Sequence, residues 1–260
     1  MTDEFRALHS GAVLVLPNAW DAASARIVER AGARAVATTS AGVAWSLGAA
    51  DGDRLSRDAA VGLVTRVVAA VGIPVTADVE SGYGATPADV ADTVRAVADA
   101  GAAGINLEDG AYPGLRPVDE QAARIAAARK AAPLFVNARI DSYLFGVGDP
   151  AARLDDTVAR AVSFADAGAD GVLVPGVVDP EIIAALASRI PVPLNVMAGP
   201  GAPSVATLAE LGVARVSVGS GIAQAAYAVA DRCARELLTD GTYDAQASGL
   251  DFAAMNALMS

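Results

Sequence analysis

The sequence of 260 residues predicts an α/β fold in which eight strands and eight helices alternate and close into a (β/α)8 barrel. Two observations lead to this prediction. Eight short apolar runs recur at broadly regular spacing, and Ala-rich segments with helical periodicity lie between them. An open doubly wound sheet would have fewer strands and a dinucleotide-binding glycine motif, and the sequence has no such motif. A single closed barrel is therefore the favoured architecture.

The eight apolar runs are the expected strands of the barrel. Several are followed by a helical segment that ends in glycine, as a helix C-cap would, and the clearest of these segments are 21–32, 87–101 and 154–168. The expected strands are residues 13–19, 33–40, 74–80, 104–110, 134–141, 171–177, 193–199 and 215–221.

The connections and the tail complete the predicted domain. The longest strand-to-helix connections are expected after the second strand, at 41–55, and after the fourth, at 111–120. The chain is expected to form one barrel domain over 1–260, in which residues 239–260 are a C-terminal extension made of a turn and a short helix.

Composition excludes several classes of protein. The net charge of -11 and the pI near 4.5 argue against a nucleic-acid partner, because phosphate binding needs clustered Lys and Arg. The single cysteine, Cys233, permits neither an intramolecular disulfide nor a CxxC motif. No basic leader and no apolar run of membrane-spanning length occurs, so a cytoplasmic protein without a membrane partner is expected. His9 lies in a polar N-terminal stretch and is expected to be exposed, without a catalytic role.

The stretch PVTADVESGYG at 74–84 ends a predicted strand on two carboxylates. Side chains alternate along a strand, so Asp78 and Glu80 are expected to share a face. Two like charges so close raise each other's pKa unless a cation lies between them. The pair therefore indicates a divalent metal site, with a solvated strand end as the alternative.

Other predicted strands also turn polar at their carboxyl ends, where barrel enzymes carry their active sites. Asp78, Glu80, Glu108 and Arg139 are expected to converge on one mouth of the barrel. Further polar residues at strand ends are Asn18, Ser40, Asp109, Asn137, Asp141, Asn195, Ser217 and Gly219.

An oxygen-only set of Asp78, Glu80 and Glu108 suits a hard cation, Mg²⁺ or alternatively Mn²⁺. Arg139 is interpreted as the fork that binds the carboxylate of a small anionic substrate, and a buried ion pair with Glu108 or Glu80 is the alternative. Asp51 precedes a glycine and is either a site residue or a plain turn residue.

Weaker signals extend this site. Gly199 to Gly201 and Gly219 to Gly221 are typical either of a phosphate cradle or of tight turns. Tyr83 follows the acidic pair and is expected either to reach the substrate or to pack in its loop.

Six motifs together resemble the isocitrate lyase and phosphoenolpyruvate mutase superfamily over roughly the first 180 residues: PNAWDAASAR, TTSAG, the Asp51-Gly52 pair, TADVESGYG, GINLEDG and NARID. The resemblance implies a (β/α)8 barrel whose last helix is often swapped between subunits of dimers or tetramers. It also implies Mg²⁺, a 2-oxo or 2-hydroxy carboxylate substrate, and the making or breaking of a carbon–carbon or carbon–phosphorus bond through an enolate.

The same resemblance implies residue roles. Asp78 matches the direct metal ligand, and Glu80 stands where the family more often has Asp. Asp51 and Glu108 match acids that act on the metal through water, and Arg139 matches the clamp for the substrate carboxylate. Asp51, Glu108 and Arg139 are thus the expected catalytic residues. Arg139 and the four residues Ser40, Ala41, Tyr83 and Asn195 are the expected substrate contacts.

The sequence also departs from the superfamily. Lyase members carry a Lys and a Cys in the loop after the fourth strand, and mutase members carry a Lys and an Asn. The corresponding loop here, AYPGLRPVDE, has none of these, and Cys233 lies far away in the sequence. Pro175 stands where many relatives have an acidic or His-containing stretch. The proton donor to the enolate is left open between Tyr83 and a metal-bound water.

The expected function is that of a Mg²⁺-dependent lyase or decarboxylase that cleaves a carbon–carbon bond next to a 2-oxo or 2-hydroxy carboxylate. One alternative is an enzyme of carbon–phosphorus bonds, such as a phosphonopyruvate hydrolase or a phosphonomutase. The other is a non-catalytic protein that binds a 2-oxo acid. A homo-oligomer, a dimer or tetramer, is expected by analogy, with the predicted helix 222–238 as the swapped element.

Overall fold

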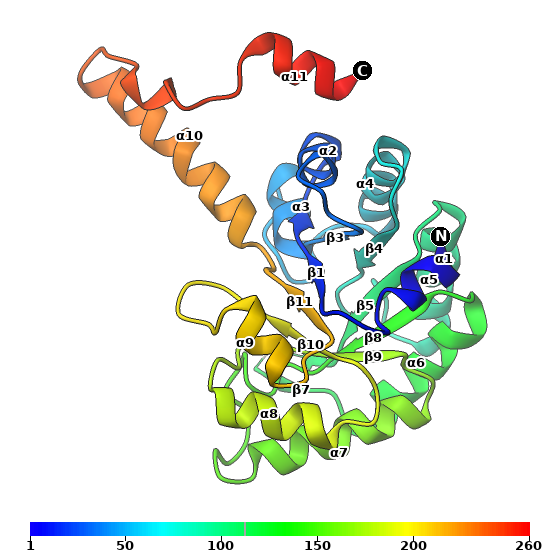
Figure 1. The fold of residues 1–260 in the computed structure, drawn as a ribbon. Coiled ribbons are helices and arrows are strands. Elements are labelled where there is room, and N and C mark those ends of the chain that lie inside the picture. Colours follow the sequence, from blue (N-terminus) through cyan, green and yellow to red (C-terminus); the bar gives the residue numbers. More distant parts are fainter. Residues whose placement is uncertain (112) are drawn as a thin grey trace.

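The computed structural model describes residues 1–111 and 113–260 as a parallel barrel surrounded by helices (Figure 1). Its nine strands follow one another around the barrel in the order β1-β11-β10-β9-β8-β5-β4-β3-β2, and all pair in parallel. The predicted fold class is confirmed. The strands are β1 (Leu14–Leu16), β2 (Asn18–Ala19), β3 (Val36–Thr38), β4 (Val75–Asp78), β5 (Gly104–Glu108), β8 (Phe135–Arg139), β9 (Gly171–Val174), β10 (Leu194–Met197) and β11 (Arg215–Ser217).

The first apolar run closes the barrel as two short strands. β1 pairs with β11, whereas β2 pairs with β3, and Pro17 separates them. Proline has no N–H to donate to a strand ladder, so the run is divided at this residue. Nine strands in the structure therefore correspond to the eight strand segments that the sequence predicts.

Helices follow the strands as predicted. The segments expected at 21–32, 87–101 and 154–168 form α2, α5 and α7, and Gly32, Gly101 and Gly168 after them have φ between 92 and 106°. The helices are α1 (Thr2–Ala7), α2 (Ala22–Arg30), α3 (Ser40–Ser46), α4 (Arg57–Ala70), α5 (Pro87–Asp99), α6 (Val118–Ala131), α7 (Arg153–Asp166), α8 (Pro180–Arg189), α9 (Val205–Glu210), α10 (Gly221–Thr239) and α11 (Phe252–Met259), with a 3₁₀ turn at Asp244–Gln246.

Two connections contain structure that the sequence did not predict. α3 occupies the first half of the connection 41–55, and residues 40 to 44 of this helix are all buried. Packing therefore supports a helix too short to be stable alone. After β5 the chain forms a small hairpin of β6 (Gly110–Ala111) and β7 (Gly114–Leu115).

The two faces of the barrel strands have different chemistry. Ile105 and Leu107 of β5 point outward and are fully buried under the helices. Inside the barrel, Asn137 Nδ2 donates to Asn106 Oδ1 (2.9 Å) and to Asn195 Oδ1 (3.2 Å). The buried amides satisfy one another, so the centre of the barrel tolerates polar side chains.

The N-terminal stretch covers the opposite end of the barrel from the strand carboxyl ends. Phe5 of α1 packs among Leu14, Leu16 and Phe135, and the His9 ring stacks on Phe135 with centroids 4.1 Å apart. His9 Nδ1 bonds the Phe5 carbonyl (2.9 Å), and His9 is only 9% exposed. The prediction that His9 is exposed is wrong, because the short helix turns this polar stretch back onto the barrel.

The last helices extend beyond the barrel. α10 leads away from it, and α11 returns over α2, where Arg26 Nη1 donates to the Leu258 carbonyl (2.9 Å; Figure 1). None of the helices within residues 1–111 and 113–260 combines the length and the apolar character needed to cross a bilayer.

The environment of His9 predicts a loss of stability in acid. Burial and the nearby Arg215 lower the pKa of His9 to about 4, whereas an unfolded histidine has a pKa of 6.5. Stability that is complete above pH 6.5 is therefore lost as the pH falls toward 4, by about 2 kcal/mol between pH 7 and pH 5. Denaturant unfolding at both pH values should give a smaller pH difference for His9→Phe, which keeps the stacked ring. An equal difference in the two proteins would contradict this assignment.

Candidate functional site at the barrel mouth

The register of the strands brings the charged residues together. Glu108 of β5 is the direct neighbour of Arg139 of β8, and Asp78 of β4 is the neighbour of Asn106 of β5. These residues lie at the carboxyl ends of their strands, where parallel strands of a barrel present side chains to one mouth.

Arg139 binds two carboxylates and lies near a third. Its Nη1 is 2.8 Å from Glu108 Oε2 and 3.9 Å from Asp78 Oδ2, and its Nε donates to Asp141 Oδ1 (2.7 Å). The buried ion pair considered as an alternative for Arg139 therefore forms with Glu108. Within the described chain no hydrogen bond uses Nη2, so one edge of the guanidinium is available to a ligand.

The electrostatics of the mouth favour an additional cation. Burial raises the pKa of Asp78, Glu108 and Asp141, and the positive charge of Arg139 opposes each of these shifts. Burial disfavours the charge of Arg139, yet Glu108 and Asp141 raise the pKa of its guanidinium. One guanidinium thus serves three carboxylates, of which Asp141 is fully buried and Asp78 and Glu108 are half-buried, an arrangement that is unfavourable without further positive charge.

The donor set of the mouth fits Mg²⁺. Asp78 and Glu108 offer carboxylate oxygens, the ligands that this hard ion prefers, and the described residues that line the cavities include no histidine or cysteine. Among the residues that the structure describes, no three acidic, histidine or cysteine side chains are grouped closely enough to hold an ion by themselves. Magnesium sites commonly use one or two carboxylates and keep several waters, so two protein ligands are sufficient.

The carboxylate of Glu80 has other partners. Its Oε2 accepts the backbone N–H groups of Gly52 (3.1 Å) and Asp53, and its Oε1 accepts the Tyr83 hydroxyl (3.1 Å). Burial raises the pKa of Glu80 to about 7. Both oxygens are engaged in hydrogen bonds, so the prediction that Glu80 binds the metal stays a prediction that this geometry does not favour.

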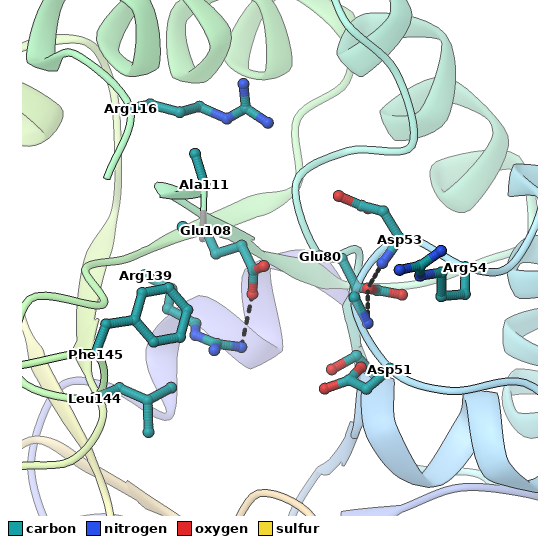
Figure 2. Close-up of a pocket in the computed structure, with 13 residues that line it drawn as sticks. Asp51, Asp53, Arg54, Glu80, Glu108, Ala111, Arg116, Arg139, Leu144 and Phe145 are labelled. Carbon is teal, nitrogen blue, oxygen red and sulfur yellow. Dashed lines mark hydrogen bonds and ion pairs between the residues drawn. The ribbon is translucent and has the colours of Figure 1, made fainter. Parts of the chain in front are cut away.

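Two adjoining cavities form the mouth, and they share Ser40, Asp51, Arg139 and Leu144. The outer one, of about 670 Å³, appears in Figure 2 with Glu80 and Glu108 on its walls. The inner one, of about 180 Å³, reaches into the barrel; its further lining residues are Asn18, Thr39, Ala41, Asp78, Asn106, Leu173, Pro175, Met197, Ser217, Gly219 and Ser220.

Most of the predicted site residues line these cavities, and two do not. Ser40, Ala41, Asp51, Asp78 and Arg139 line the inner cavity, and Glu80 and Glu108 line the outer one.

Asn195 and Tyr83 are the exceptions among the expected substrate contacts. Asn195 is 1% exposed, and its amide bonds Asn137 and Ser217 inside the barrel. Tyr83 donates its hydroxyl to Glu80 and lies outside both cavities. The geometry therefore does not favour a substrate contact for either, because their polar atoms serve the protein itself. Of the two glycine turns, the one at Gly219 reaches the inner cavity.

The residues of the outer cavity that sequence reasoning did not find include Arg54, Arg116, Leu144 and Phe145. They lie in connections after strands, where neither periodicity nor a strand end marks a residue as facing the site. Figure 2 shows Leu144 and Phe145 beside Arg139, and Arg54 and Arg116 on different walls.

Asp109 supports the mouth from beneath. It is fully buried, its Oδ1 accepts the backbone N–H of Asp141 (2.9 Å), and its Oδ2 pairs with Arg160 (3.1 Å). Burial raises the pKa of Asp109 to about 6, although the Asp141 N–H and the charge of Arg160 both lower it. Asp109 thus fixes the segment after β8 and makes no contact with either cavity.

Comparison with known proteins places the chain among enzymes. The family model described as phosphoenolpyruvate phosphomutase matches residues 5–238. An uncharacterized protein of Mycobacterium tuberculosis is 43% identical over 213 residues, which cover 82% of this chain and 80% of that protein. Oxaloacetate decarboxylase 2 of Pseudomonas putida is 32% identical over 178 residues, which cover 66% of this chain and 58% of the decarboxylase.

Solved structures agree with this relationship. A provisionally assigned lyase/mutase of Burkholderia cenocepacia has a TM-score of 0.92 at 41% identity, covering 98% of this chain and 95% of that one. A phosphonopyruvate hydrolase in complex with oxalate and Mg²⁺ has a TM-score of 0.86 at 25% identity, covering 99% of this chain and 94% of the hydrolase.

The packing at the mouth predicts unequal effects of two glycine substitutions. A Cβ at Gly110 would lie 2.7 Å from Asp141 Oδ2 and 3.2 Å from the Phe145 ring, whereas a Cβ at Gly114 would meet nothing within 4 Å. Gly110→Ala should therefore cost about 1–3 kcal/mol of unfolding free energy, measured by denaturant titration. Gly114→Ala, in the same hairpin, should stay within about 0.5 kcal/mol of the parent protein. Equal losses would mean that the mouth is not packed as described.

Proposed function

This chain belongs to the phosphoenolpyruvate phosphomutase family, and on that basis we propose that it is a Mg²⁺-dependent lyase or decarboxylase. The membership of the isocitrate lyase and phosphoenolpyruvate mutase superfamily, predicted from its motifs, is confirmed. The proposed reaction cleaves a carbon–carbon bond adjacent to the carboxylate of a 2-oxo or 2-hydroxy acid.

The observation that supports the proposal most is that a positively charged group and a negatively charged group line the same small cavity. Arg139 offers a free guanidinium edge, and Asp78 offers a half-buried carboxylate, on the walls of a space of about 180 Å³. A 2-oxo carboxylate needs both, a cation for its carboxylate and a metal for its adjacent oxygens. A volume this small suits a molecule of a few carbon atoms rather than a nucleotide or a peptide.

In the proposed mechanism the residues of the mouth orient the substrate and exclude water. Arg139 binds the carboxylate of the substrate through Nη2. Ser40 and Ala41, at the start of α3, position the other end of the substrate. Asp78 and Glu108 would hold Mg²⁺, and Asp51 would order water near it. When bound, Mg²⁺ supplies positive charge that stabilises an enolate. Tyr83 is not assigned as the proton donor, because its hydroxyl bonds Glu80 outside the cavities.

Relatives favour decarboxylation or carbon–carbon cleavage over the alternatives. Curated relatives include oxaloacetate decarboxylases of several Pseudomonas species and a 2-methylisocitrate lyase of Bacillus subtilis that is 28% identical over 205 residues. Carbon–phosphorus chemistry is the second candidate, because the chain resembles a phosphonopyruvate hydrolase and Gly219 and Ser220 line the inner cavity.

Purified protein with Mg²⁺ should convert at least one of oxaloacetate, 2-methylisocitrate, dimethylmalate and phosphonopyruvate. Proton and phosphorus NMR would measure the conversion. Asp78→Asn should reduce the rate by about 100-fold or more, because it removes a charged ligand while preserving its shape. Asp166→Asn, on the exposed side of α7, is the matched control and should leave the rate unchanged.

The products distinguish the candidate functions. Pyruvate or a second carbonyl product that Asp78→Asn abolishes would establish the lyase or decarboxylase. Phosphorus-containing products would favour the carbon–phosphorus enzyme. A Mg²⁺-dependent rise of the melting temperature with oxalate, without turnover of any compound, would favour a 2-oxo acid binding protein. Turnover that survives removal of Mg²⁺ would contradict the proposal.

We also propose that the protein assembles as a dimer or tetramer in which α10 covers a neighbouring subunit. Val15 of β1 is 45% exposed although its neighbours Leu14 and Leu16 are buried, so this side of the barrel lacks a covering helix. On α10, Tyr227, Val229 and Leu238 are 41%, 42% and 84% exposed. Apolar groups left in water on both surfaces are typical of an interface.

Light scattering after size exclusion tests this assembly. The protein should have the mass of a dimer or tetramer, and Val229→Glu should shift it toward the monomer, because a charge would be buried in the interface. Val162→Glu, at an exposed apolar position on α7, is the matched control and should not change the mass. A monomeric parent protein would contradict the assembly and leave the proposed reaction untouched.

A further inference from the structure

We propose that Glu80 is a positioning residue that holds the connection 50–55, and with it Asp51, against the barrel mouth. The carboxylate acts through backbone N–H groups rather than as a ligand of the metal. The proposal rests on the proposed function only for its metal-binding readout, because the position of the connection can be measured without turnover.

The segment that carries Glu80 is firmly anchored. The Arg124 side chain of α6 is fully buried and donates to the carbonyls of Ser81 (2.5 Å), Gly84 (2.9 Å) and Ala85 (3.0 Å). Thr93 of α5 donates its hydroxyl to the Gly82 carbonyl (2.7 Å). Two helices thus hold the turn after β4, so Glu80 projects from a rigid base.

The connection that Glu80 reaches has few other hydrogen bonds, and Leu55 at its end packs against the hydrophobic cluster that contains Leu63 of α4. Hydrogen bonds of the α3 end extend to the N–H of Ala49, and the side chain of Ser56 caps α4. Between them, every hydrogen bond that the described chain makes to residues 50–55 ends on the Glu80 carboxylate, at Gly52 and Asp53. Asp51 immediately precedes these two residues and lines both cavities. Its position at the mouth therefore depends on Glu80.

Backbone conformation supports the same conclusion. Asp53, Glu80 and Tyr83 have φ of 54°, 50° and 53°, and they are the non-glycine residues of the described chain with positive φ. This region is unfavourable for residues with a Cβ and persists where surrounding contacts enforce it. All three residues meet at one carboxylate, since Asp53 and Tyr83 both donate to Glu80.

The length of the Glu80 side chain distinguishes a positioning role from a metal ligand. Gln keeps the length and can accept the two backbone N–H groups through its carbonyl, while its NH₂ group can donate to the Tyr83 hydroxyl. Asp keeps the charge but is one methylene shorter, so it cannot reach Gly52 and Asp53 from the anchored turn. A ligand role requires the charge, whereas a positioning role requires the reach.

Hydrogen exchange of the metal-free protein tests this difference directly. Glu80→Gln should retain the protection of the amides at Gly52 and Asp53, and Glu80→Asp should accelerate their exchange by about tenfold or more. The affinity for Mn²⁺, measured by titration followed by electron paramagnetic resonance, should fall by about tenfold in Glu80→Asp, because Asp51 is no longer positioned. It should fall by less in Glu80→Gln.

The opposite order would overturn the proposal. If Glu80→Asp keeps both protection and Mn²⁺ affinity while Glu80→Gln loses affinity, Glu80 is a metal ligand. Tyr83→Phe removes one donor and leaves both backbone bonds, so protection at Gly52 and Asp53 should persist. If Glu80→Asp unfolds, Glu80→Gln still decides the question: retained protection with retained Mn²⁺ affinity supports positioning, and retained protection with lost Mn²⁺ affinity indicates a metal ligand.

A second carboxylate in the chain provides a matched control. Glu236 accepts the N–H groups of Asp244 and Ala245 (both 2.7 Å) and the Thr242 hydroxyl (2.6 Å), so it holds a segment far along the chain in the same way. Glu236→Asp should accelerate exchange at Asp244 and Ala245 without changing Mn²⁺ affinity. Should the protein turn over none of the tested substrates, the exchange measurements on both glutamates would still decide the role of Glu80.

Discussion

The guanidinium of Arg139 faces three carboxylates at the barrel mouth, one fully buried and two half-buried, and the arrangement of the mouth follows from this imbalance. Glu108 and Asp141 bind it directly, and Asp78 lies 3.9 Å away. Burial makes each negative charge unfavourable, so the site gains most from a divalent cation and a substrate carboxylate that bind together. In the proposed site, the cation would neutralise the acids and the substrate carboxylate would bind the Nη2 edge of Arg139. The proposed chemistry thus depends on an excess of negative charge at the mouth that is present in the protein without any ligand.

Around Arg139, several polar side chains support the barrel rather than line the site. The Asn106, Asn137 and Asn195 amides bond one another inside the barrel. Asp109 and Arg160 fix the segment after β8, and Arg124 fixes the turn after β4. Above this supported base, the connection 50–55 depends on one carboxylate. The proposed site therefore combines anchored strand ends with a connection that Glu80 holds through hydrogen bonds.

Motifs predicted residues of the barrel mouth where the direction of a side chain follows the period of a strand. Asp78, Glu108 and Arg139 alternate inward at strand ends, and the register of β5 and β8 makes two of them neighbours. The same reasoning does not hold for Asn195. Alternation predicts that its side chain points inward, but not that its amide lies deep in the barrel and bonds Asn137 and Ser217. Arg54, Arg116, Leu144 and Phe145 escaped notice because residues in connections follow no period.

Local patterns in the sequence by themselves determined the parallel barrel, its helices, the acidic mouth and the family, because periodicity, helix caps and short motifs are properties of neighbouring residues. Only the tertiary structure decided how the polar atoms are shared. It buried His9 against Phe135 and committed the Glu80 oxygens to Gly52, Asp53 and Tyr83. Such outcomes depend on contacts between residues far apart in the chain, where burial and competing hydrogen-bond donors decide which partner each carboxylate takes.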